Sequence, residues 1–364
     1  MTAALNASRW YTIDMPDDIP PHTGAGGFDD HGELDRDSPT EPAPSLDEVI
    51  DAIADESHAI PYDDLPALSS VDQSQAAQLL GLWPRIEPAR RRELLASLER
   101  LAEEDATLDF HMVHLTALRD PDPATRILAV RGLWEEERDD IMRILTDMLR
   151  GDAESTVRAE AATTLGQYVV SMEFGMLDED AAEHLAETLR DAIEDSAEED
   201  EVRARALEAI GALSEEWVAE MIADTYETGG PRMRLATIRA MGRHASDDWL
   251  PVLIHNFDDD DAETRAAAAT SAGQLLLDTA VGPLAALVDD TDDEVQVAAV
   301  EALGEIGGDA AEAILVRLLE RESGLADAAR RALATLRLSN FEPHVASADD
   351  DDDDESGNGE HGPR

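Results

Sequence analysis

The chain has 364 residues, which is enough for two ordinary domains or for one extended repeat array with flanking tails. Its 83 acidic and 28 basic residues give a formal net charge of −55, and all the basic residues are arginine because lysine is absent. Binding to nucleic acid or to an anionic membrane needs a basic surface, so we expect neither as a partner. Salt screens such self-repulsion, which favours a host with a salt-rich cytoplasm; circular dichroism at low and at molar NaCl would test this hypothesis.

The sequence also excludes several kinds of chemistry and location. It contains no cysteine, which excludes disulfides, thiolate zinc sites and cysteine nucleophiles. The first residues lack the basic and apolar segments of a signal peptide, and no apolar stretch approaches about 18 residues. We therefore expect a cytoplasmic protein without a membrane span.

The two ends of the chain have the composition of disordered segments. Residues 1–44 are rich in Pro, Gly and Asp without apolar periodicity, and they are predicted to be a disordered leader. The alternative there is a short linear motif around Trp10. Residues 339–364 include the acidic run Asp349–Glu355 and are predicted to be a disordered tail rather than a binding motif for cations or basic partners.

Residues 45–108 are predicted to form an N-terminal helical cap. Ser45 followed three residues later by Glu48 has the pattern of a capping box at a helix start. Two further helices, interrupted near Pro84 and Pro88, carry leucine-rich faces. We expect them to be a degenerate first hairpin.

Seven similar segments lie between residues 109 and 338. They are TRILAVRGLW, VRAEAATTLG, VRARALEAIG, MRLATIRAMG, TRAAAATSAG, VQVAAVEALG and LADAARRALA. Their second position, called the slot here, is occupied in turn by Arg126, Arg158, Arg203, Arg234, Arg265, Gln296 and Ala326. The first six slots are spaced by 32, 45, 31, 31 and 31 residues, so the period is about 31 with one insertion. This self-similarity predicts an all-α, right-handed solenoid of helical hairpins.

Three positions after the slot have a packing interpretation. The third residue after it is small in every unit: Ala129, Ala161, Ala206, Thr237, Ala268, Ala299 and Ala329. The seventh is apolar, and the third and seventh share one helical face, which predicts a buried stripe. The eighth is glycine in five units: Gly166, Gly211, Gly242, Gly273 and Gly304. Glycine inside a helix costs about 1 kcal/mol relative to alanine, so its repetition predicts a close backbone approach.

Acidic residues accompany the arginines. The fourth residue before the slot is acidic in most units: Asp122, Glu154, Glu199, Asp261 and Asp292. We expect these carboxylates to favour the helix N-terminus and to pair with the slot arginine of their own or an adjacent repeat. The arginines are interpreted as a structural ladder of Arg126, Arg158, Arg203, Arg234 and Arg265, which ends near the C-terminal units where Gln296 and Ala326 replace arginine.

The combined pattern D-x-x-x-[VTM]-R-x-x-A-x-x-x-[LIM]-G, preceded by an amphipathic helix, resembles HEAT repeats of the short, phycobilisome-lyase-like class. The resemblance covers about 230 residues in seven units. It implies stacked helical hairpins whose second helices line the concave surface. This repeat class serves many unrelated roles, so the resemblance specifies fold rather than function.

Segment 168–180, YVVSMEFGMLDED, accounts for the 45-residue spacing. We expect it to extend the second helix of its hairpin and to form a longer loop at one edge. Insertions in solenoids are often binding elements, although a tolerated loop is the alternative.

No motif for catalysis, cofactor binding or metal binding stands out. His111 and His114 lie three residues apart beside Asp109, but no third ligand or HExxH pattern accompanies them. The aspartate runs at 258–261 and 289–293 lack the glycine and terminal glutamate of a calcium loop and are interpreted as capping turns. Nucleotide-binding and nucleophile-elbow motifs are missing from the sequence. We therefore expect no cofactor and no enzyme activity.

The exposed face of the second helices is the preferred candidate for partner binding. Positions two, five and nine after the slot point outward, and we select from them Arg131, Arg205, Glu208, Arg239, Arg243 and Gln274 as a groove for a protein or peptide. A solvated helix face is the alternative. The partner is expected to be a protein, with basic patches as one possibility from the global acidity, and the chain itself is expected to be a monomer.

Two classes of function compete at this point. The first is a non-catalytic scaffold or adaptor that binds a partner on its concave face. The second is an enzyme or chromophore chaperone resembling the bilin lyases, which would need an aromatic pocket for a tetrapyrrole. The repeat-region candidates for such a pocket are dispersed: Trp134, Tyr168, Trp217, Tyr226 and Trp249. An alkylpurine glycosylase, a third idea, conflicts with the net charge.

Overall fold

The computed structural model describes residues 44–134, 138–320 and 324–339, and the predicted disordered ends at 1–44 and 339–364 lie outside these ranges except for residues 44 and 339. The chain divides into two compact units, Met1–His244 and Ala245–Arg364, each of which we describe by itself. All regular structure in the described ranges is helical. None of the helices there is long and apolar enough to cross a lipid bilayer.

The first unit contains the predicted cap and the first four repeats. Its elements in chain order are α1 (Leu46–Ala54), η3 (Tyr62–Leu68), α2 (Gln73–Leu82), η4 (Trp83–Arg85), α3 (Pro88–Glu104), α4 (His111–Ala117), α5 (Pro123–Arg131), α6 (Asp139–Gly151), α7 (Ser155–Glu173), α8 (Glu179–Glu194), α9 (Asp200–Ile210), α10 (Glu216–Thr228) and α11 (Pro231–His244).

The second unit contains the remaining three repeats. Its elements are η5 (Asp247–Trp249), α12 (Leu250–His255), η6 (Asn256–Asp258), α13 (Ala262–Gln274), η7 (Asp278–Ala280), α14 (Val281–Leu287), α15 (Asp293–Ile306), α16 (Gly308–Glu320) and α17 (Ala326–Ser339).

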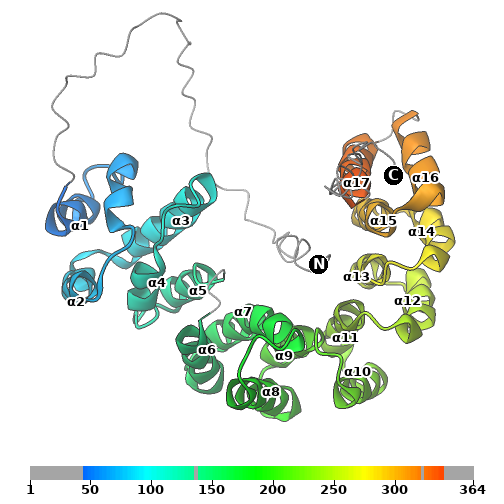
Figure 1. The fold of residues 1–364 in the computed structure, drawn as a ribbon, viewed down its shortest axis with the longest axis horizontal. Helices are drawn as coiled ribbons and strands as arrows, with labels where there is room; N and C mark the ends of the chain where they lie inside the picture. Colours follow the sequence, from blue (N-terminus) through cyan, green and yellow to red (C-terminus); the bar gives the residue numbers. More distant parts are fainter. Residues whose placement is uncertain (1–43, 135–137, 321–323, 340–364) are drawn as a thin grey trace, which may run out of the picture. The chain divides into compact units, whose positions relative to one another are not determined.

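Each unit is a stack of helical hairpins. In the first unit, α4, α6, α8 and α10 pack as first helices against α5, α7, α9 and α11. The second helices also pack on one another in sequence, from α3 through α5, α7 and α9 to α11, and form one continuous row (Figure 1). In the second unit α13, α15 and α17 form the corresponding row, backed by α12, α14 and α16. The predicted all-α solenoid of hairpins is confirmed, and all seven aligned segments lie on these second helices.

The predicted buried stripe is the centre of the core. The small residue three positions after the slot has 0% exposure in every one of the seven repeats. The residue seven positions after the slot is buried in every repeat as well, including Ala272, the one small residue in that column. Small side chains at the third position let adjacent second helices approach closely, while larger ones at the seventh fill the space beside them. Burial of this stripe between neighbours is why one hairpin alone would not be stable.

The predicted helix starts agree with the observed caps. The Ser45 hydroxyl accepts a hydrogen bond from the Glu48 backbone N–H at 3.4 Å, and the Glu48 carboxylate accepts one from the Ser45 N–H at 2.8 Å. Asp122, Asp261 and Asp292 cap α5, α13 and α15 in the same way. These carboxylates therefore satisfy backbone donors at the start of three second helices, whereas Glu154 and Glu199, at the starts of α7 and α9, make no side-chain cap hydrogen bond.

Glycine eight positions after the slot marks a close approach, as the sequence predicts, but not to the same degree in each repeat. A Cβ atom added at Gly273 would lie 2.7 Å from Cα of Ala302, and one at Gly304 would lie 2.7 Å from Cα of Ala332. At Gly211 the corresponding distance to Ala240 is 3.0 Å. Gly166 has more room, since its nearest protein atoms would be 3.4 to 3.5 Å away.

Gly304→Ala is therefore expected to destabilise the chain even though alanine is the better helix former. The added methyl group meets the backbone of α17, which cannot move without shifting the hairpin, and overpacking of this kind costs roughly 1–3 kcal/mol. The free energy of unfolding in urea measures the effect. Gly282→Ala in α14, where no atom lies within 4 Å of the added carbon, is the matched control and should be neutral. Equal stability of the two variants would contradict the close packing.

The insertion lengthens α7 and then forms a loop. Tyr168 to Glu173 continue the helix, and Tyr168 is fully buried at 1% exposure. Residues 174–178 then connect α7 to α8, whose N-terminus is capped by Asp178. The extra length is thus divided between a longer second helix and an exposed turn.

Candidate functional site

Three of the slot arginines connect their repeat to the turn of the next repeat. Arg126 donates two hydrogen bonds to the carboxylate of Asp152, at 2.9 and 2.7 Å, and Arg265 donates two to Asp290, at 2.9 and 2.8 Å. Arg158 does the same to Glu198, at 2.8 and 2.7 Å. Bidentate arginine–carboxylate pairs fix both distance and orientation, so these contacts hold the register between neighbouring repeats.

The same arginines also brace the turn that precedes their own helix. Arg126 donates to the backbone carbonyl of Asp120, and Arg158 to that of Asp152, both at 2.8 Å. Arg265 donates to the carbonyl of Asp259 at 2.9 Å, and Gln296 keeps this contact through its amide, to Asp290 at 2.6 Å. In all four cases the accepting residue is an aspartate six positions before the slot. Asp152 and Asp290 therefore each make two contacts. The backbone carbonyl accepts a hydrogen bond from the slot residue of the same repeat, and the carboxylate accepts from the slot arginine of the preceding repeat.

These contacts affect the acidity of the bound carboxyl groups. Hydrogen bonds from Arg158 lower the pKa of Glu198, and hydrogen bonds from Arg265 lower the pKa of Asp290. At Asp152, burial opposes the shift, but hydrogen bonds from Arg126 and from the Glu154 N–H still leave the pKa lowered. A lowered pKa means that each group stabilises the fold above its ordinary pKa and loses that contribution as the pH falls.

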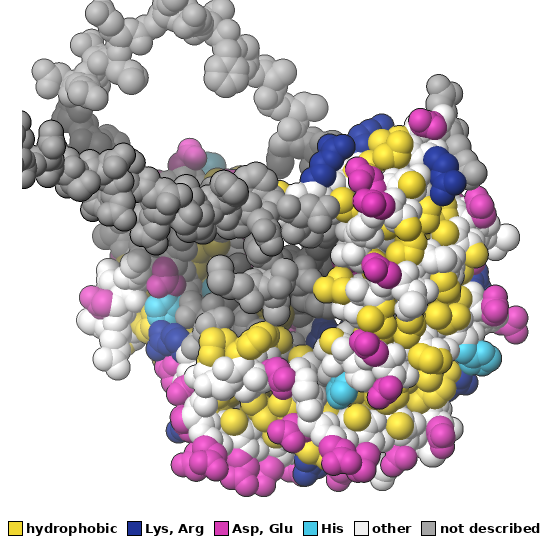
Figure 2. All heavy atoms as spheres, turned by 45° about the vertical axis from the view of Figure 1, so that its right-hand side comes forward, with side chains coloured by type: hydrophobic (Ala, Val, Ile, Leu, Met, Phe, Trp, Pro, Cys, Tyr) yellow, Lys and Arg dark blue, Asp and Glu magenta, His cyan; other side chains and the backbone are white. Residues whose placement is uncertain are grey.

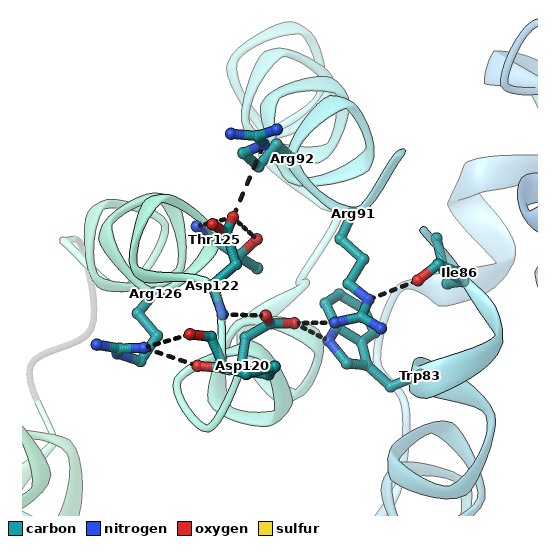
Figure 3. A network of polar contacts seen from close by, with 9 residues as sticks. Trp83, Ile86, Arg91, Arg92, Asp120, Asp122, Thr125 and Arg126 are labelled. Atoms are coloured by element: carbon teal, nitrogen blue, oxygen red, sulfur yellow. Dashed lines mark hydrogen bonds and ion pairs between the residues drawn. The ribbon is translucent and has the colours of Figure 1, made fainter. Parts of the chain in front are cut away.

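The series begins one repeat earlier than the sequence pattern indicates (Figure 3). Arg91, on α3 of the N-terminal cap, donates to the Asp120 carboxylate at 2.7 Å and to the carbonyl of Ile86 at 2.7 Å. Trp83 donates its indole N–H to the same carboxylate at 2.6 Å. Arg91 is 7% exposed and Asp120 3% exposed, so this pair is the most buried of the series. In the sequence Arg91 precedes Arg126 by 35 residues. It is one of three consecutive arginines, so this spacing alone does not distinguish it.

The predicted ladder is interrupted in the middle of the first unit. Arg203 donates to the carbonyl of Ile193 at 3.0 Å and to Asp200 at 3.1 Å, both within its own hairpin. The residue six positions before the next slot is Thr228, which offers no carboxylate for Arg203. Arg234 lies over the ring of Tyr226, 5.1 Å from its centre. Asp122, Asp261 and Asp292, four positions before the slot, cap their helices. Arg126, Arg158 and Arg265 instead pair with an acid five or six positions before the slot of the next repeat.

The predicted groove residues of α9 and α11 meet around one buried carboxylate. Glu208, 5% exposed, accepts hydrogen bonds from Arg205 at 3.1 Å and from Arg239 at 3.3 Å. Arg243 donates to the backbone carbonyl of the same residue at 3.0 Å. Glu201 completes the group by accepting from Arg205 at 2.9 Å. The residues of the face predicted to bind a partner therefore also connect two adjacent second helices, α9 and α11.

The other two groove candidates lie apart from this group. Arg131 on α5 pairs with Glu160 on α7 through two hydrogen bonds of 3.0 Å. Gln274 ends α13 in the second unit, where its Oε1 atom is buried without a hydrogen-bond partner among the described residues. The structure therefore brings together Arg205, Glu208, Arg239 and Arg243.

The electrostatics of this face differ from those of the chain as a whole. Acidic side chains far outnumber arginines on the surface seen in Figure 2, as the net charge of −55 requires. Along the second-helix row of the first unit, the positions two, five and nine after each slot instead contain four arginines and three glutamates: Arg131, Arg205, Arg239, Arg243, Glu135, Glu160 and Glu208. These seven residues sum to +1. A local positive balance of this kind attracts carboxylates within about a Debye length.

The two histidines considered for metal binding have separate environments. His114 is buried, and its ring occupies the space where a Cβ atom of Gly132 would be. His111 instead pairs with Asp109 at 2.6 Å. Among the described residues, no three His, Asp or Glu side chains lie close enough together to hold a metal ion.

The aromatic residues considered for a chromophore pocket are engaged in different parts of the fold. Tyr168 is in the core, and Trp217 lies under the guanidinium of Arg190 at 3.7 Å. Two surface hollows, of about 450 Å³ along α16 and about 600 Å³ beside the start of α3, are lined by charged and small residues without an aromatic wall. Neither hollow has the lining that a tetrapyrrole site needs.

Comparison with known families identifies the fold class. The family model for HEAT repeats matches residues 113–197, 186–273 and 250–336, which together span more than half of the chain. The chain therefore belongs to the HEAT-repeat family. No curated protein matches the sequence.

Several solved structures are similar to the chain at low identity. The YIBA_ECOLI protein of E. coli is 15% identical, with a TM-score of 0.41, over 77% of this chain and 97% of its own. The complex of CpcE and CpcF of phycocyanin lyase from a Nostoc species is 18% identical, with a TM-score of 0.39, over 83% and 98%. Human deoxyhypusine hydroxylase is 18% identical, with a TM-score of 0.31, over 80% and 96%. At TM-scores below 0.5 these likenesses carry no functional argument.

Proposed function

We propose that the chain is a non-catalytic scaffold that binds another protein through the second-helix row of its first unit, centred on α9 and α11. The observation that carries the proposal is the positive sum of the outward positions on this row, +1, in a chain whose net charge is −55. Arginine-rich patches of this kind recur among the residues that dominate protein interfaces.

The arrangement of the arginines supports binding as well as stability. Arg205 and Arg239 each keep 33% of their side chain exposed while one edge of each guanidinium is held by Glu208. A side chain that is already held in one orientation loses less rotamer freedom when a partner binds. The buried Glu208 carboxylate therefore positions the two arginines to meet an incoming group.

The partner's chemistry follows from the local charge rather than from the global one. A basic partner would suit the acidic surface elsewhere, but the α9–α11 face favours a segment that carries carboxylates. Bidentate arginine–carboxylate contacts would give such a segment both affinity and orientation. Protein is favoured over nucleic acid because phosphate backbones would be repelled by the acidic remainder of the chain.

The double substitution Arg239→Glu with Arg243→Glu tests the proposal. We expect it to abolish retention of the partner on a column of the full-length chain, because two attractive contacts become repulsive. Since the change also lowers the net charge by four, the matched control is Arg119→Glu with Arg138→Glu, which makes the same charge change on exposed positions of the same unit. Thermal unfolding followed by circular dichroism checks that both variants fold. Partner retention by the α11 variant would refute the assignment.

A further inference from the structure

The loop that follows α7 holds two large apolar side chains in solvent. Phe174 is 59% exposed and Met176 is 60% exposed, in contrast to the buried apolar residues of α7. Both belong to the insertion that interrupts the 31-residue period. We call Phe174, Gly175 and Met176 the α7 knuckle.

The backbone of the α7 knuckle is fixed by the end of the helix. The N–H of Phe174 donates to the carbonyl of Val170 at 3.2 Å, and that of Gly175 to Met172 at 2.9 Å. The N–H of Met176 donates to the carbonyl of Ser171 at 2.9 Å. Gly175 has a φ of +67°, a left-handed conformation that ends helices and favours glycine. The two apolar side chains therefore project from a defined helix cap rather than from an open loop.

The knuckle is also tied to the neighbouring loop. The carboxylate of Glu173 accepts a hydrogen bond from the backbone N–H of Ser214, between α9 and α10, at 2.9 Å. This bond joins the turns of two consecutive repeats along one edge of the first unit. The surface around Phe174 consequently includes the exposed start of α10.

The charged residues in the two stretches that adjoin the apolar pair all have one sign. Asp178, Glu179 and Asp180 follow Met176 and are exposed, as are Glu215 and Glu216 on the neighbouring loop. Neither stretch, 173–180 or 214–216, contains an arginine. An exposed Phe–Met pair rimmed by carboxylates is complementary to a segment that combines an apolar side chain with lysine or arginine.

We propose that the α7 knuckle is a docking anchor for a partner protein's amphipathic basic segment, whose apolar residue packs on Phe174 and Met176 while its basic residues face the surrounding carboxylates. The site is distinct from the arginine face of α9 and α11 and takes the opposite charge. A single exposed apolar residue is ordinary on a protein surface. Phe174 and Met176 lie on one hydrogen-bonded turn, inside the insertion of a regular repeat, and the adjoining charged residues are all acidic. This combination indicates a binding site for a partner.

Binding of short labelled peptides to the full-length chain tests this proposal. The probe is a fluorescein-labelled helical peptide of leucine and lysine, with two relatives in which serine replaces leucine or glutamate replaces lysine. Fluorescence anisotropy at physiological ionic strength gives the dissociation constant. We expect Phe174→Ala with Met176→Ala to weaken binding of the leucine–lysine peptide at least about tenfold, since both contacts lie at the centre of the site.

Two matched variants separate this result from other causes. Leu80→Ala with Ile144→Ala removes two exposed apolar side chains elsewhere in the same unit and should leave the dissociation constant within about twofold of the unmodified chain. Arg239→Glu with Arg243→Glu should bind the peptide at least as tightly, so failure of the proposed scaffold face would not affect this test. The proposal would be overturned if the Phe174 and Met176 variant bound the leucine–lysine peptide as tightly as the unmodified chain does. It would also be overturned if the leucine–glutamate peptide bound as tightly as the leucine–lysine peptide, or if no peptide bound.

Discussion

Replacing Asp120 with alanine is expected to lower the free energy of unfolding by about 3–5 kcal/mol, the largest effect of any single substitution considered. The carboxylate is 3% exposed and accepts from Trp83, from Arg91 and from the N–H of Asp122 at 2.6, 2.7 and 2.8 Å. Its removal leaves the buried Arg91 guanidinium without its counter-ion, although the Ile86 carbonyl still accepts from it, and leaves the Trp83 indole N–H without an acceptor. Urea denaturation followed by circular dichroism measures the loss.

Two further variants identify the cause of that loss. Asp120→Asn keeps one carbonyl acceptor and should cost less than alanine. Asp140→Asn removes a carboxylate that is 61% exposed in its pair with Arg138 and should change stability by no more than about 1 kcal/mol. If Asp120→Ala cost no more than Asp140→Asn, the buried network would not hold the cap to the first repeat.

The stability of the chain is expected to fall between pH 6.5 and about pH 4 because of His114. Burial is the main cause that lowers the pKa of this imidazole to about 4, and the neighbouring His111 adds to the shift. Above pH 6.5 the imidazole is neutral in both the folded and the unfolded chain. Between the two values the unfolded chain binds a proton that the folded chain does not, so stability decreases as the pH falls.

The full size of this effect is about 3 kcal/mol, which is the shift from 6.5 to about 4 at 1.36 kcal/mol per pH unit. Urea denaturation at pH 5 and at pH 7 tests it in a range where the carboxylates of the ladder remain ionised. His114→Leu should remove most of the difference between the two pH values, whatever it does to the absolute stability. His58→Gln, which changes a histidine whose side chain is 78% exposed, should leave the difference in place. An unchanged pH dependence in His114→Leu would exclude the buried imidazole as its source.

The sequence alone predicts the repeat fold because its signals are local to each helix. The small residue three positions after the slot and the apolar residue seven positions after it lie on one helical face, and that periodicity is visible without knowledge of neighbours. Helix starts are equally local, since an aspartate such as Asp122 caps a backbone group three residues away. Even the close approach at Gly304 is predictable, because a costly residue repeats at one register.

The partners of the arginines could not be predicted with the same certainty because they lie in other repeats. The sequence pattern predicts the paired acid four positions before the slot, in the same or an adjacent repeat, whereas Arg126 pairs with Asp152, six positions before the next slot. The aspartate six positions before the slot is a signal for Asp120, Asp152 and Asp290, whereas Glu198, the partner of Arg158, lies five positions before its slot and lacks this signal. Six positions before the slot of Arg234 the residue is Thr228, so Arg203 has no carboxylate to pair with at that position.

The candidate binding face illustrates the same difference between local and tertiary information. The outward direction of Arg205 and Arg239 follows from helix geometry and is predictable. The burial of Glu208 between them is not, because it depends on how closely α9 and α11 pack. The structure therefore changes the interpretation of these arginines from free charges on a solvated surface to oriented groups around one carboxylate.

Hydrogen–deuterium exchange of the full-length chain, with and without the partner that it retains, tests the central claim most directly. If the chain is a scaffold that binds through the second-helix row of its first unit, protection on binding should centre on α9 and α11 and should disappear in Arg239→Glu with Arg243→Glu. The Arg119→Glu with Arg138→Glu control should show the same protection as the unmodified chain. Protection confined to the first helices α6, α8 and α10, or retained in the α11 variant, would contradict the account.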